Sequence, residues 1–167
     1  MKNPAPASRI ERTTYNGPLG TMTLAASTQG LCGVWFDGQA HQPDPQQWEM
    51  NAAHPVLQAA CSQLTAYFAA QAARFDLPLD MALGTPFQQS VWQRLQGIPY
   101  GVTQSYGEIA RSLGQPAASR AVGAAVGRNP LSIIVPCHRV VGSKGALTGY
   151  AGGLERKIAL LQLEKAL

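Results

Sequence analysis

A series of short helices, separated by glycine and proline stops, occupies residues 85 to 127 and sets narrow limits on the fold. Apolar residues recur at helical spacing from Ser105 to Leu113, and Gly114 ends that helix. A second helix is expected to begin at Pro116 or Ala117 and to end near Gly127. Two short helices joined by a tight turn that contains a glycine predict a helix-turn-helix unit.

The elements on either side complete a mainly helical C-terminal part. Thr85 and Pro86 supply an N-cap and a first helical position, and four apolar residues then share one face: Phe87, Val91, Trp92 and Leu95. Leu147 to Ala151 is predicted as a short extended piece, which after a helix-turn-helix indicates a wing. The last helix is expected over Leu154 to Leu167, with a packing side formed by Leu154, Ile158, Leu161 and Lys165.

Alternating segments near the N-terminus predict a small antiparallel sheet. Thr13 to Tyr15 and Gly20 to Ala26 flank the turn Asn16-Gly17-Pro18, and a third strand is expected over Gly30 to Phe36. Each of these segments is short and bounded by turn residues, as strands of a small sheet are.

A helix and one further strand are predicted to follow this sheet. The helix begins at Pro45 or Gln46, breaks near His54-Pro55 and continues over Val56 to Ala70, and Phe75 to Leu79 alternates like a strand. We place a domain boundary at Gly84, which divides the chain into residues 1–84 and 85–167. The predicted class is therefore α+β: a small antiparallel sheet with a helix, and then a helical domain with a winged helix-turn-helix.

The composition is that of a globular protein with one domain or two small ones. The 167 residues are 46% hydrophobic and 13% charged, which excludes a disordered chain and a large multidomain machine. The net charge of +4 is unevenly divided, since residues 1–84 sum to −2 and residues 85–167 to +6. The basic surplus accompanies the predicted helix-turn-helix and fits a polyanionic partner, although it also fits an ordinary basic protein.

The cysteines and the N-terminus indicate the compartment. Cys32, Cys61 and Cys137 form neither a C-x-x-C motif nor a secreted disulfide framework, so a reducing cytosol is expected. Met1 to Ile10 lacks the apolar core of a signal peptide, and no segment approaches the roughly 18 apolar residues that span a bilayer. We expect a soluble, unexported, cytoplasmic protein with no membrane partner and, because the cysteines and histidines are scattered, no structural metal.

The helix expected over residues 117 to 127 has one face of unusually small residues. A mostly apolar stripe can pack inward: Ala118, Ala121, Val122, Ala125 and Val126. The opposite face carries small residues and one arginine: Ala117, Arg120, Gly123, Ala124 and Gly127. Such a face allows close approach to a DNA groove. The pattern also fits a buried alanine-rich helix with one exposed arginine.

The strongest local signal lies in residues 133 to 141, where two apolar β-branched runs flank Pro136-Cys137-His138-Arg139. Proline fixes the approach of the chain and removes an amide donor, which exposes one side chain at a rigid corner. A thiol becomes a nucleophile as its thiolate, and His138 or Arg139 nearby can depress its pKa. The run is thus typical of a buried strand that turns at a reactive cysteine.

Two other interpretations of these residues stay open. A lone cysteine beside a strand also fits an inert core residue, which is the role expected for Cys32 and Cys61. Glu164 on the last helix fits a solvated surface charge, and it would orient the imidazole of His138 as a third member of a relay only if it reached that ring. His41 and His54 fit surface positions.

Taken in order, these motifs resemble the O6-alkylguanine-DNA alkyltransferases, the methylated-DNA--protein-cysteine methyltransferases of bacterial type. The resemblance is dense over residues 85 to 165 and only general over the first 84. Four motifs carry it: Arg120-Ala121-Val122-Gly123, Asn129-Pro130, Pro136-Cys137-His138-Arg139-Val140-Val141 and Gly149-Tyr150-Ala151-Gly152-Gly153.

The resemblance implies a single-turnover repair reaction without a cofactor. An alkyl group would pass from O6 of guanine, and also from O4 of thymine, in double-stranded DNA to Cys137 after base flipping. His138 would deprotonate the thiol through a water, and Glu164 would hold the imidazole. Asn129 would brace the turn before the active site. A monomer is expected.

The resemblance also implies contacts with the base and with the duplex. Tyr106 would donate toward the guanine, the carbonyls of Cys137 and Val140 would read its exocyclic amine, and Tyr150 would wall the pocket. Arg120 would enter the duplex in place of the flipped nucleotide. Five further residues are expected at the base or the DNA: Ser105, Ala121, Gly123, Ala124 and Ala151.

Two positions depart from some members of the family. Ala151 stands where some have serine, a mild change because the contact expected there uses a backbone amide. Ser132 stands where a proline narrows the pocket in some relatives, which predicts room for bulkier alkyl groups.

Three other functions compete with alkyl transfer. A silent binder of alkylated bases would lack Cys137. A helix-turn-helix regulator would not need Pro-Cys-His-Arg or Asn129. A cysteine hydrolase would draw its cysteine and histidine from distant segments and would need an oxyanion hole.

Overall fold

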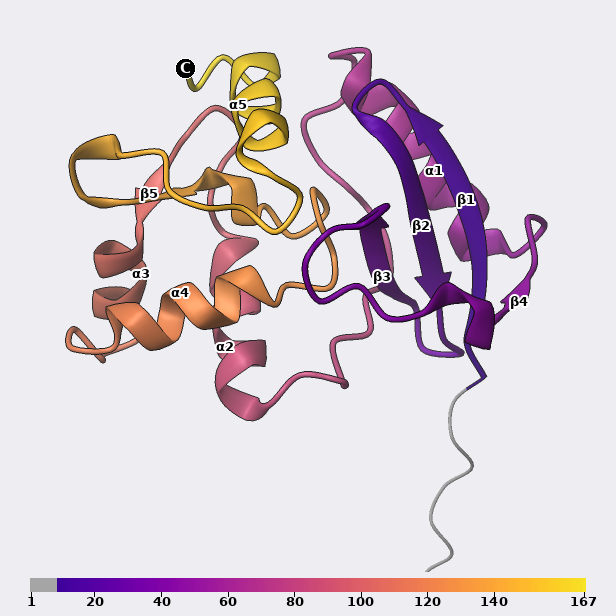
Figure 1. The fold of residues 1–167 in the computed structure, drawn as a ribbon, viewed down its shortest axis with the longest axis horizontal. Coiled ribbons are helices and arrows are strands. Elements are labelled where there is room, and N and C mark those ends of the chain that lie inside the picture. Colours follow the sequence, from indigo (N-terminus) through magenta and orange to yellow (C-terminus); the bar gives the residue numbers. More distant parts are fainter. Residues whose placement is uncertain (1–8) are drawn as a thin grey trace, which may run out of the picture.

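The computed structural model describes residues 9–167, in which an N-terminal half with a sheet lies beside a C-terminal half of helices (Figure 1). Residues 1–8, which include most of the segment examined for a signal peptide, lie outside the described residues. No helix within residues 9–167 combines the length and the apolar character that a membrane span requires.

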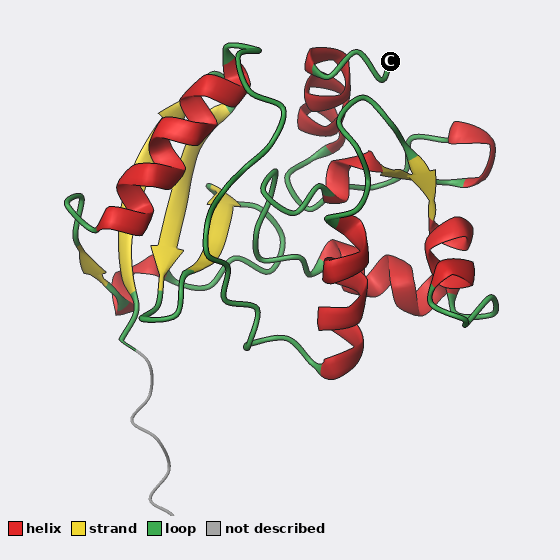
Figure 2. Ribbon diagram, turned by 180° about the vertical axis from the view of Figure 1, so that it is seen from behind, coloured by secondary structure: helices red, strands yellow, loops and turns green. Residues whose placement is uncertain are grey.

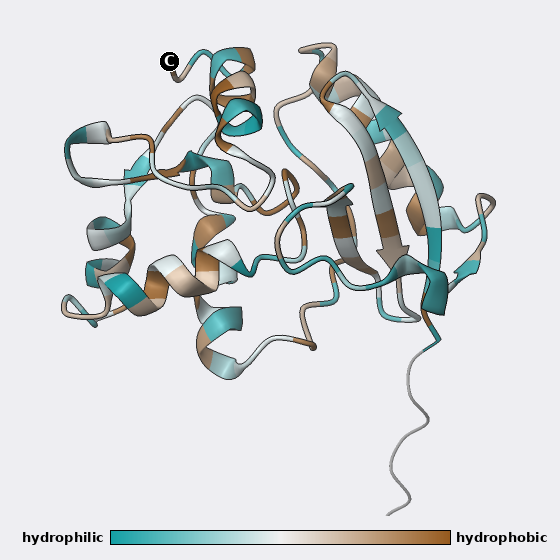
Figure 3. Cartoon of the chain, in the orientation of Figure 1, coloured by the Kyte–Doolittle hydropathy of each residue, from teal (hydrophilic) through white to brown (hydrophobic). Residues whose placement is uncertain are grey.

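The N-terminal half is a four-stranded sheet in the order β3-β2-β1-β4. β1 (Glu11–Gly17), β2 (Gly20–Ala26) and β3 (Leu31–Phe36) pair antiparallel as predicted, and β4 (Glu49–Met50) adds a short parallel pairing to β1. α1 (Pro55–Phe68) covers one face of this sheet (Figure 2). β1 is mostly hydrophilic, whereas β2 and β3 carry hydrophobic bands that belong to the core (Figure 3).

The helix predicted from Pro45 is wrong in its first part. The structure has a single 3-10 turn at Pro45–Gln47, which the Asp44 side chain caps by accepting a hydrogen bond from the Gln46 amide at 2.9 Å. The chain then extends into β4, and the Trp48 ring stacks on Trp35 of β3 with 5.7 Å between centroids. The partly buried Trp48 packs against the sheet from an extended segment, not from a continued helix.

The strand predicted over Phe75 to Leu79 is reduced to one bridge between Leu79 and Leu31. The Leu31 amide donates to the Pro78 carbonyl, and the Asp80 amide donates to the Leu31 carbonyl, both at 2.8 Å. Because Pro78 has no amide hydrogen, the pairing does not extend further along the segment.

Four helices build the C-terminal half: α2 (Pro86–Leu95), α3 (Tyr106–Ser112), α4 (Ser119–Gly127) and α5 (Leu154–Leu163). α2 and α3 each begin with a capping box, from Thr85 and Gln88 and from Ser105 and Glu108. The helix-turn-helix of α3 and α4 is confirmed, and α4 begins slightly later than predicted. Val91, Trp92 and Leu95 of α2 are buried as expected.

The wing predicted over Leu147 to Ala151 needs correction. This segment is a loop, and the strand pairing in this half is instead a parallel one between β5 (Gln104–Ser105) and β6 (Val140–Val141). The Thr148 carbonyl accepts a hydrogen bond from the Lys157 side chain at 3.2 Å instead of from a neighbouring strand.

α5 is shorter than predicted and packs through a different side. It ends at Leu163. Beyond the end, Lys165 adopts a φ of +57°, and the Ala166 amide donates a hydrogen bond to the Leu161 carbonyl at 2.8 Å. This geometry is that of a Schellman cap. The buried residues of the helix are Lys157, Leu160 and Leu161, whereas Leu154 is 42% exposed.

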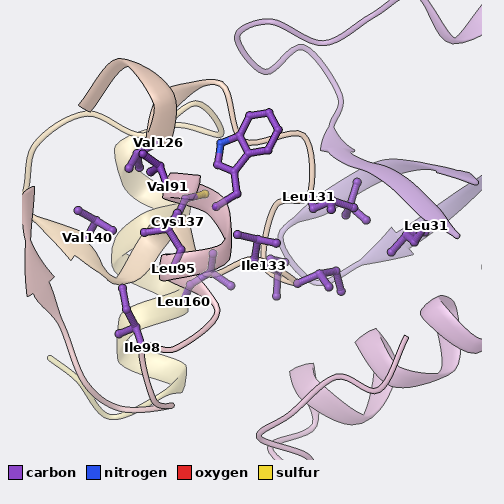
Figure 4. Close-up of a cluster of buried hydrophobic side chains, with 14 of the residues drawn as sticks. Leu31, Val91, Leu95, Ile98, Val126, Leu131, Ile133, Cys137, Val140 and Leu160 are labelled. Atoms are coloured by element: carbon purple, nitrogen blue, oxygen red, sulfur yellow. The ribbon is translucent and has the colours of Figure 1, made fainter. Parts of the chain in front are cut away.

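One hydrophobic core joins the two halves. Leu131 lies between Leu31 of the sheet and Ile133 of the C-terminal half (Figure 4). The edge of β3 holds this segment, since the Val34 amide donates to the Pro130 carbonyl at 2.7 Å and the Ser132 amide donates to the Val34 carbonyl at 3.1 Å. The chain that leads to Cys137 is therefore fixed by the N-terminal sheet.

Candidate active site

Cys137 begins a 3-10 turn, Cys137–Arg139, directly after Pro136. The apolar run before it is buried, but residues 132 to 134 form a turn, and Val135 a bend, instead of the strand that the β-branched pattern predicts, with Ile133 at a φ of +71°. The side chain of Cys137 lies in the core among Val91 and Val126 and is 4% exposed (Figure 4).

Asn129 spans this turn with two hydrogen bonds. Its side-chain amide donates to the Val135 carbonyl at 2.9 Å, and its side-chain oxygen accepts from the Leu131 amide at 3.0 Å. Asn129 is itself 3% exposed. The geometry is that of a brace between the two ends of the turn, as the resemblance implies.

A pocket of about 500 Å³ opens onto Cys137. Four of the predicted residues line it: Tyr106, Gly123, Tyr150 and Ala151. The N-terminal half contributes Ala40 and His41 to the same wall, and the Ala40 amide donates to the Ala151 carbonyl at 3.1 Å. His41 was predicted only as a surface residue, because nothing local links it to a segment more than a hundred positions away.

Val140 and Ser132 are not among the residues that line this pocket. The Val140 side chain is fully buried, its carbonyl accepts from the Lys157 side chain at 2.6 Å, and its amide donates to the Cys137 carbonyl. The carbonyls of Cys137 and Val140 each keep a second lone pair that can accept from another donor. Ser132 is 1% exposed and faces Gln39, so the expectation that it widens the pocket is not supported.

Behind Cys137, Glu164 and His138 form a buried pair. His138 Nε2 lies 2.7 Å from Glu164 Oε2, and both side chains are fully buried. Arg139 donates to both carboxylate oxygens, from Nε at 2.7 Å and from Nη2 at 2.9 Å. The condition that Glu164 reach the imidazole is met, and the interpretation of Glu164 as a solvated surface charge is wrong.

The charge states of Glu164 and His138 leave the imidazole of His138 able to act as a base. Burial alone would raise the pKa of Glu164, but hydrogen bonds from His138 and Arg139 lower it to about 2. The ionised carboxylate only accepts, so His138 Nε2 carries the proton. Burial lowers the pKa of His138, against the opposing effect of Glu164, and the ring is neutral at pH 7. Its Nδ1 is therefore an unprotonated acceptor.

The thiol itself is protonated at neutral pH. Burial raises the pKa of Cys137, and the nearby side chains of Asn129, Lys157 and Tyr150 oppose this effect. A step that uses the thiolate consequently needs a proton acceptor. Cys32 and Cys61 lie apart from the pocket, and burial raises the pKa of Cys32 to about 11 and also raises that of Cys61.

The sequence reasoning missed two residues at this site. Tyr67 of α1 donates to Glu164 Oε2 at 2.5 Å across the two halves, and Lys157 of α5 is 1% exposed and donates to the Val140 carbonyl. A tyrosine on an apolar helix face and a lysine in an amphipathic helix give no local signal of these long-range bonds. Lys157 lies on the same helical face as Leu160 and Leu161, and this spacing is the one feature of the sequence that indicates its burial.

The small face of α4 is partly as predicted. Val122, Ala125 and Val126 are buried, but Ala121 is exposed and so lies outside the inward stripe, on the surface with Arg120 and Ala124. Gly123 backs onto the Tyr106 ring, since a Cβ there would lie 3.8 Å from it. Ser105 is half-buried and uses its hydroxyl to cap α3, accepting from the Glu108 amide at 3.1 Å.

Comparison with known proteins assigns both halves to one family. Residues 10–81 match the family described as "6-O-methylguanine DNA methyltransferase, ribonuclease-like domain" and residues 86–166 match its "DNA binding domain". A methylated-DNA--protein-cysteine methyltransferase of Mycobacterium tuberculosis is 48% identical over 157 residues, 94% of this chain and 93% of that protein. The Mycobacterium leprae protein of the same name is 50% identical over 156 residues, 93% of each chain.

Solved structures agree with these sequence matches. A crystal structure of Mycobacterium tuberculosis OGT in complex with DNA superposes with a TM-score of 0.87 at 48% identity and covers 93% of each chain. The α+β class predicted from the sequence is consistent with this fold. With family models matching both halves and relatives near half-identical over almost the whole length, the chain belongs to the 6-O-methylguanine DNA methyltransferase family.

Proposed function

We propose that this protein repairs double-stranded DNA by transferring the alkyl group from O6 of guanine, or from O4 of thymine, to the thiol of Cys137. The observation that carries the proposal is a protonated thiol at a pocket, followed directly in the chain by a neutral histidine whose Nδ1 has no hydrogen-bond partner among residues 9–167. A pocket on Cys137 accommodates a base only when that base has left the stack.

The transfer is a direct displacement at the alkyl carbon. The thiol proton moves to His138 Nδ1, directly or through a water, while Glu164 accepts the Nε2 proton as a hydrogen bond and stabilises the imidazolium that forms. The S–C bond forms as the C–O6 bond breaks, and the guanine leaves with the electron pair. Tyr106 lines the pocket and accepts from Thr148 at 3.3 Å, which leaves its own proton to donate to the departing base.

The reaction ends after one turnover. The product is a thioether, whose alkyl group is not readily displaced from sulfur, so the thiol of Cys137 is not regenerated. The DNA-facing surface is the small face of α4, defined here by Arg120, Ala121 and Ala124, which are all exposed. Arg120 takes the place of the flipped nucleotide, and the short neighbours allow the backbone to approach the groove.

We assign residues 1–84 to a supporting domain and residues 85–167 to the domain that binds DNA and accepts the alkyl group. The protein acts as a monomer in the cytoplasm. The net charge of +6 in residues 85–167 supports DNA binding by that domain. The three unpaired cysteines support a reducing compartment.

The test is the mass of the intact protein after incubation with a duplex that contains one O6-methylguanine. The protein is expected to gain one methyl group as the duplex loses one, and the same duplex with ordinary guanine gives no change. Cys137→Ser should bind the modified duplex without any gain. Loss of methyl from the DNA without a gain on the protein would contradict the proposal, as would binding by the wild type with the methyl left on the DNA.

A further inference from the structure

Two buried side-chain atoms lack a hydrogen-bond partner within the described part of the chain, and both belong to residues around Cys137: His138 Nδ1 and Tyr150 Oη. Nearly all buried polar groups in proteins are bonded, so each such atom calls for an explanation. His138 Nδ1 accepts the thiol proton in the reaction proposed above. The Tyr150 hydroxyl has no part in that reaction.

The Tyr150 ring is held beside the thiol. Tyr150 and Cys137 line the same pocket. Gly152 lets the ring lie close to the backbone, because a Cβ there would come within 2.9 Å of Tyr150 and of Phe36 from β3. The Gly153 amide donates to the Tyr150 carbonyl at 2.9 Å and closes the turn.

A buried polar pair from both halves lies near this hydroxyl, since Ser132 is among the side chains that act on Tyr150. Ser132 donates to the side-chain oxygen of Gln39 at 3.2 Å, and that oxygen also accepts from the Phe36 amide at 2.8 Å. Ser132 and Gln39 are 1% and 7% exposed. A serine hydroxyl has one proton, so Ser132 has none left to give to Tyr150.

The electrostatics are consistent with a donor at this place. Burial raises the pKa of Tyr150 well above its ordinary 10.0, so the phenol keeps its proton at neutral pH. The proximity of the Tyr150 side chain also lowers the pKa of Cys137, beside the effects of Asn129 and Lys157. The side chains that act on the thiol are therefore Asn129, Lys157 and Tyr150.

We propose that the Tyr150 hydroxyl donates a hydrogen bond to the Cys137 thiolate as it forms, and that the Ser132–Gln39 pair, which joins the two halves, positions this hydroxyl. The proposal rests on the proposed alkyl transfer to Cys137. No proton leaves Tyr150: the thiol proton goes to His138, the phenol stabilises the negative sulfur, and the charge disappears when the S–C bond forms. Donation to a charged acceptor is stronger than between neutral groups.

The test is Tyr150→Phe, which keeps the ring and removes only an unpartnered oxygen. The melting temperature is expected to stay within a few degrees of the wild type. The single-turnover rate with free O6-benzylguanine should fall about tenfold or more, the effect of losing one charge-assisted hydrogen bond. Tyr15→Phe, a remote change in β1, is the matched control and should keep the wild-type rate.

A second readout is independent of alkyl transfer from a base. The pH dependence of iodoacetamide labelling, read on the peptide of residues 129–139, reports the pKa of the Cys137 thiol, and Tyr150→Phe should raise that pKa. An unchanged pKa together with a wild-type transfer rate would overturn the proposal and leave the transferase function intact. A wild type that takes iodoacetamide but no alkyl group from guanine would instead refute the transferase function, while the labelling still tests Tyr150.

Ser132→Ala tests the positioning pair. It should slow the transfer several-fold in the wild-type background and have little further effect in Tyr150→Phe, because both changes act through one hydroxyl. Fully additive effects in the double variant would contradict the positioning role.

Discussion

At the scale of single residues, the chemistry depends on two buried groups that are both neutral at rest. Burial raises the pKa of the Cys137 thiol above its ordinary 9.0, and burial lowers the pKa of His138 below its ordinary 6.5. Over the interval between these two values the thiol holds its proton and the imidazole is ready to take it. The site therefore differs from one with a preformed thiolate, whose reactivity would follow the titration of the cysteine alone.

The single-turnover rate is expected to be flat with pH across this interval. His138 becomes protonated only in acid below pH 6.5, and the thiol ionises only above pH 9.0, so neither titration changes the rate between them. The measurement is the rate of Cys137 alkylation by free O6-benzylguanine from about pH 5 to about pH 9.5, a range that extends beyond the ordinary pKa values of both groups. A tenfold rise for each pH step between about 7 and 9 would indicate a titrating thiolate and contradict this account.

Glu164 should make stability depend on pH in a defined window. Its pKa is lowered from 4.5 to about 2 in the folded state, so it stabilises the fold above pH 4.5 and loses that effect as the pH falls toward 2. The difference in unfolding free energy between the wild type and Glu164→Gln should therefore shrink from pH 6 to pH 3, roughly the span of this linkage. Urea denaturation measures it, with the exposed Glu155→Gln of the same helix as control. A constant difference would refute the assignment.

At the scale of elements, the reactive turn is held by contacts on both of its sides. The edge of β3 bonds the segment of Leu131, and Asn129 joins that segment to Val135 just before the cysteine. The turn contains a non-glycine residue at positive φ, Ile133, which costs conformational energy and persists only where its surroundings fix it. Asn129 and β3 supply that support.

Asn129→Ala should destabilise the protein by about 2–4 kcal/mol, because it leaves the buried Leu131 amide and Val135 carbonyl without their partners. The transfer rate should fall as well, since the position of Cys137 follows that of the turn. Chemical denaturation gives the first quantity, and Asn16→Ala at the exposed hairpin is the control. Full stability in Asn129→Ala would show that the turn does not need its brace.

The elements that the sequence predicts well are those with local signals. Thr85 and Ser105 cap helices through residues three positions away, and the turn before Gly20 joins neighbouring strands. The helix expected from Pro45 fails because Trp48 is recruited by the distant Trp35. Local spacing contains no information about such a partner.

The same contrast holds for the site. Cys137, His138 and Asn129 lie in one short stretch whose composition is unusual, and the resemblance gives them their expected roles. Tyr67 and Lys157 enter through bonds between segments far apart in the chain, so no spacing rule identifies them.

At the scale of the whole molecule, the N-terminal half does more than support its neighbour. Its α1 sends Tyr67 to the Glu164 carboxylate, and the chain after β3 reaches the pocket wall through Ala40 (Figure 1). α4 contributes Gly123, Val126 and Gly127 to the Cys137 pocket, whereas Arg120 on the same helix is exposed and lies outside that lining. A variant at Arg120 should therefore separate the proposed duplex binding from the chemistry in the pocket.

Arg120→Ala should affect only the reaction with duplex DNA. Arg120 is exposed and does not line the Cys137 pocket, so transfer from free O6-benzylguanine should match the wild type. Transfer from O6-methylguanine in a duplex should fall at least about tenfold, because no side chain then fills the place of the flipped nucleotide in the base stack. Arg74→Ala, an exposed arginine of the N-terminal half, controls for lost charge. Equal losses on both substrates would contradict this separation.

The identity of the alkylated residue tests the central claim most directly. After reaction with a duplex containing O6-methylguanine, trypsin releases residues 129–139, which contain Cys137 alone, and residues 13–74, which contain Cys32 and Cys61. Mass spectrometry of the digest should find the methyl group on the 129–139 peptide, with residues 13–74 unmodified. A methyl group on the 13–74 peptide, or on neither peptide after the DNA has been repaired, would contradict the assignment of Cys137 as the acceptor.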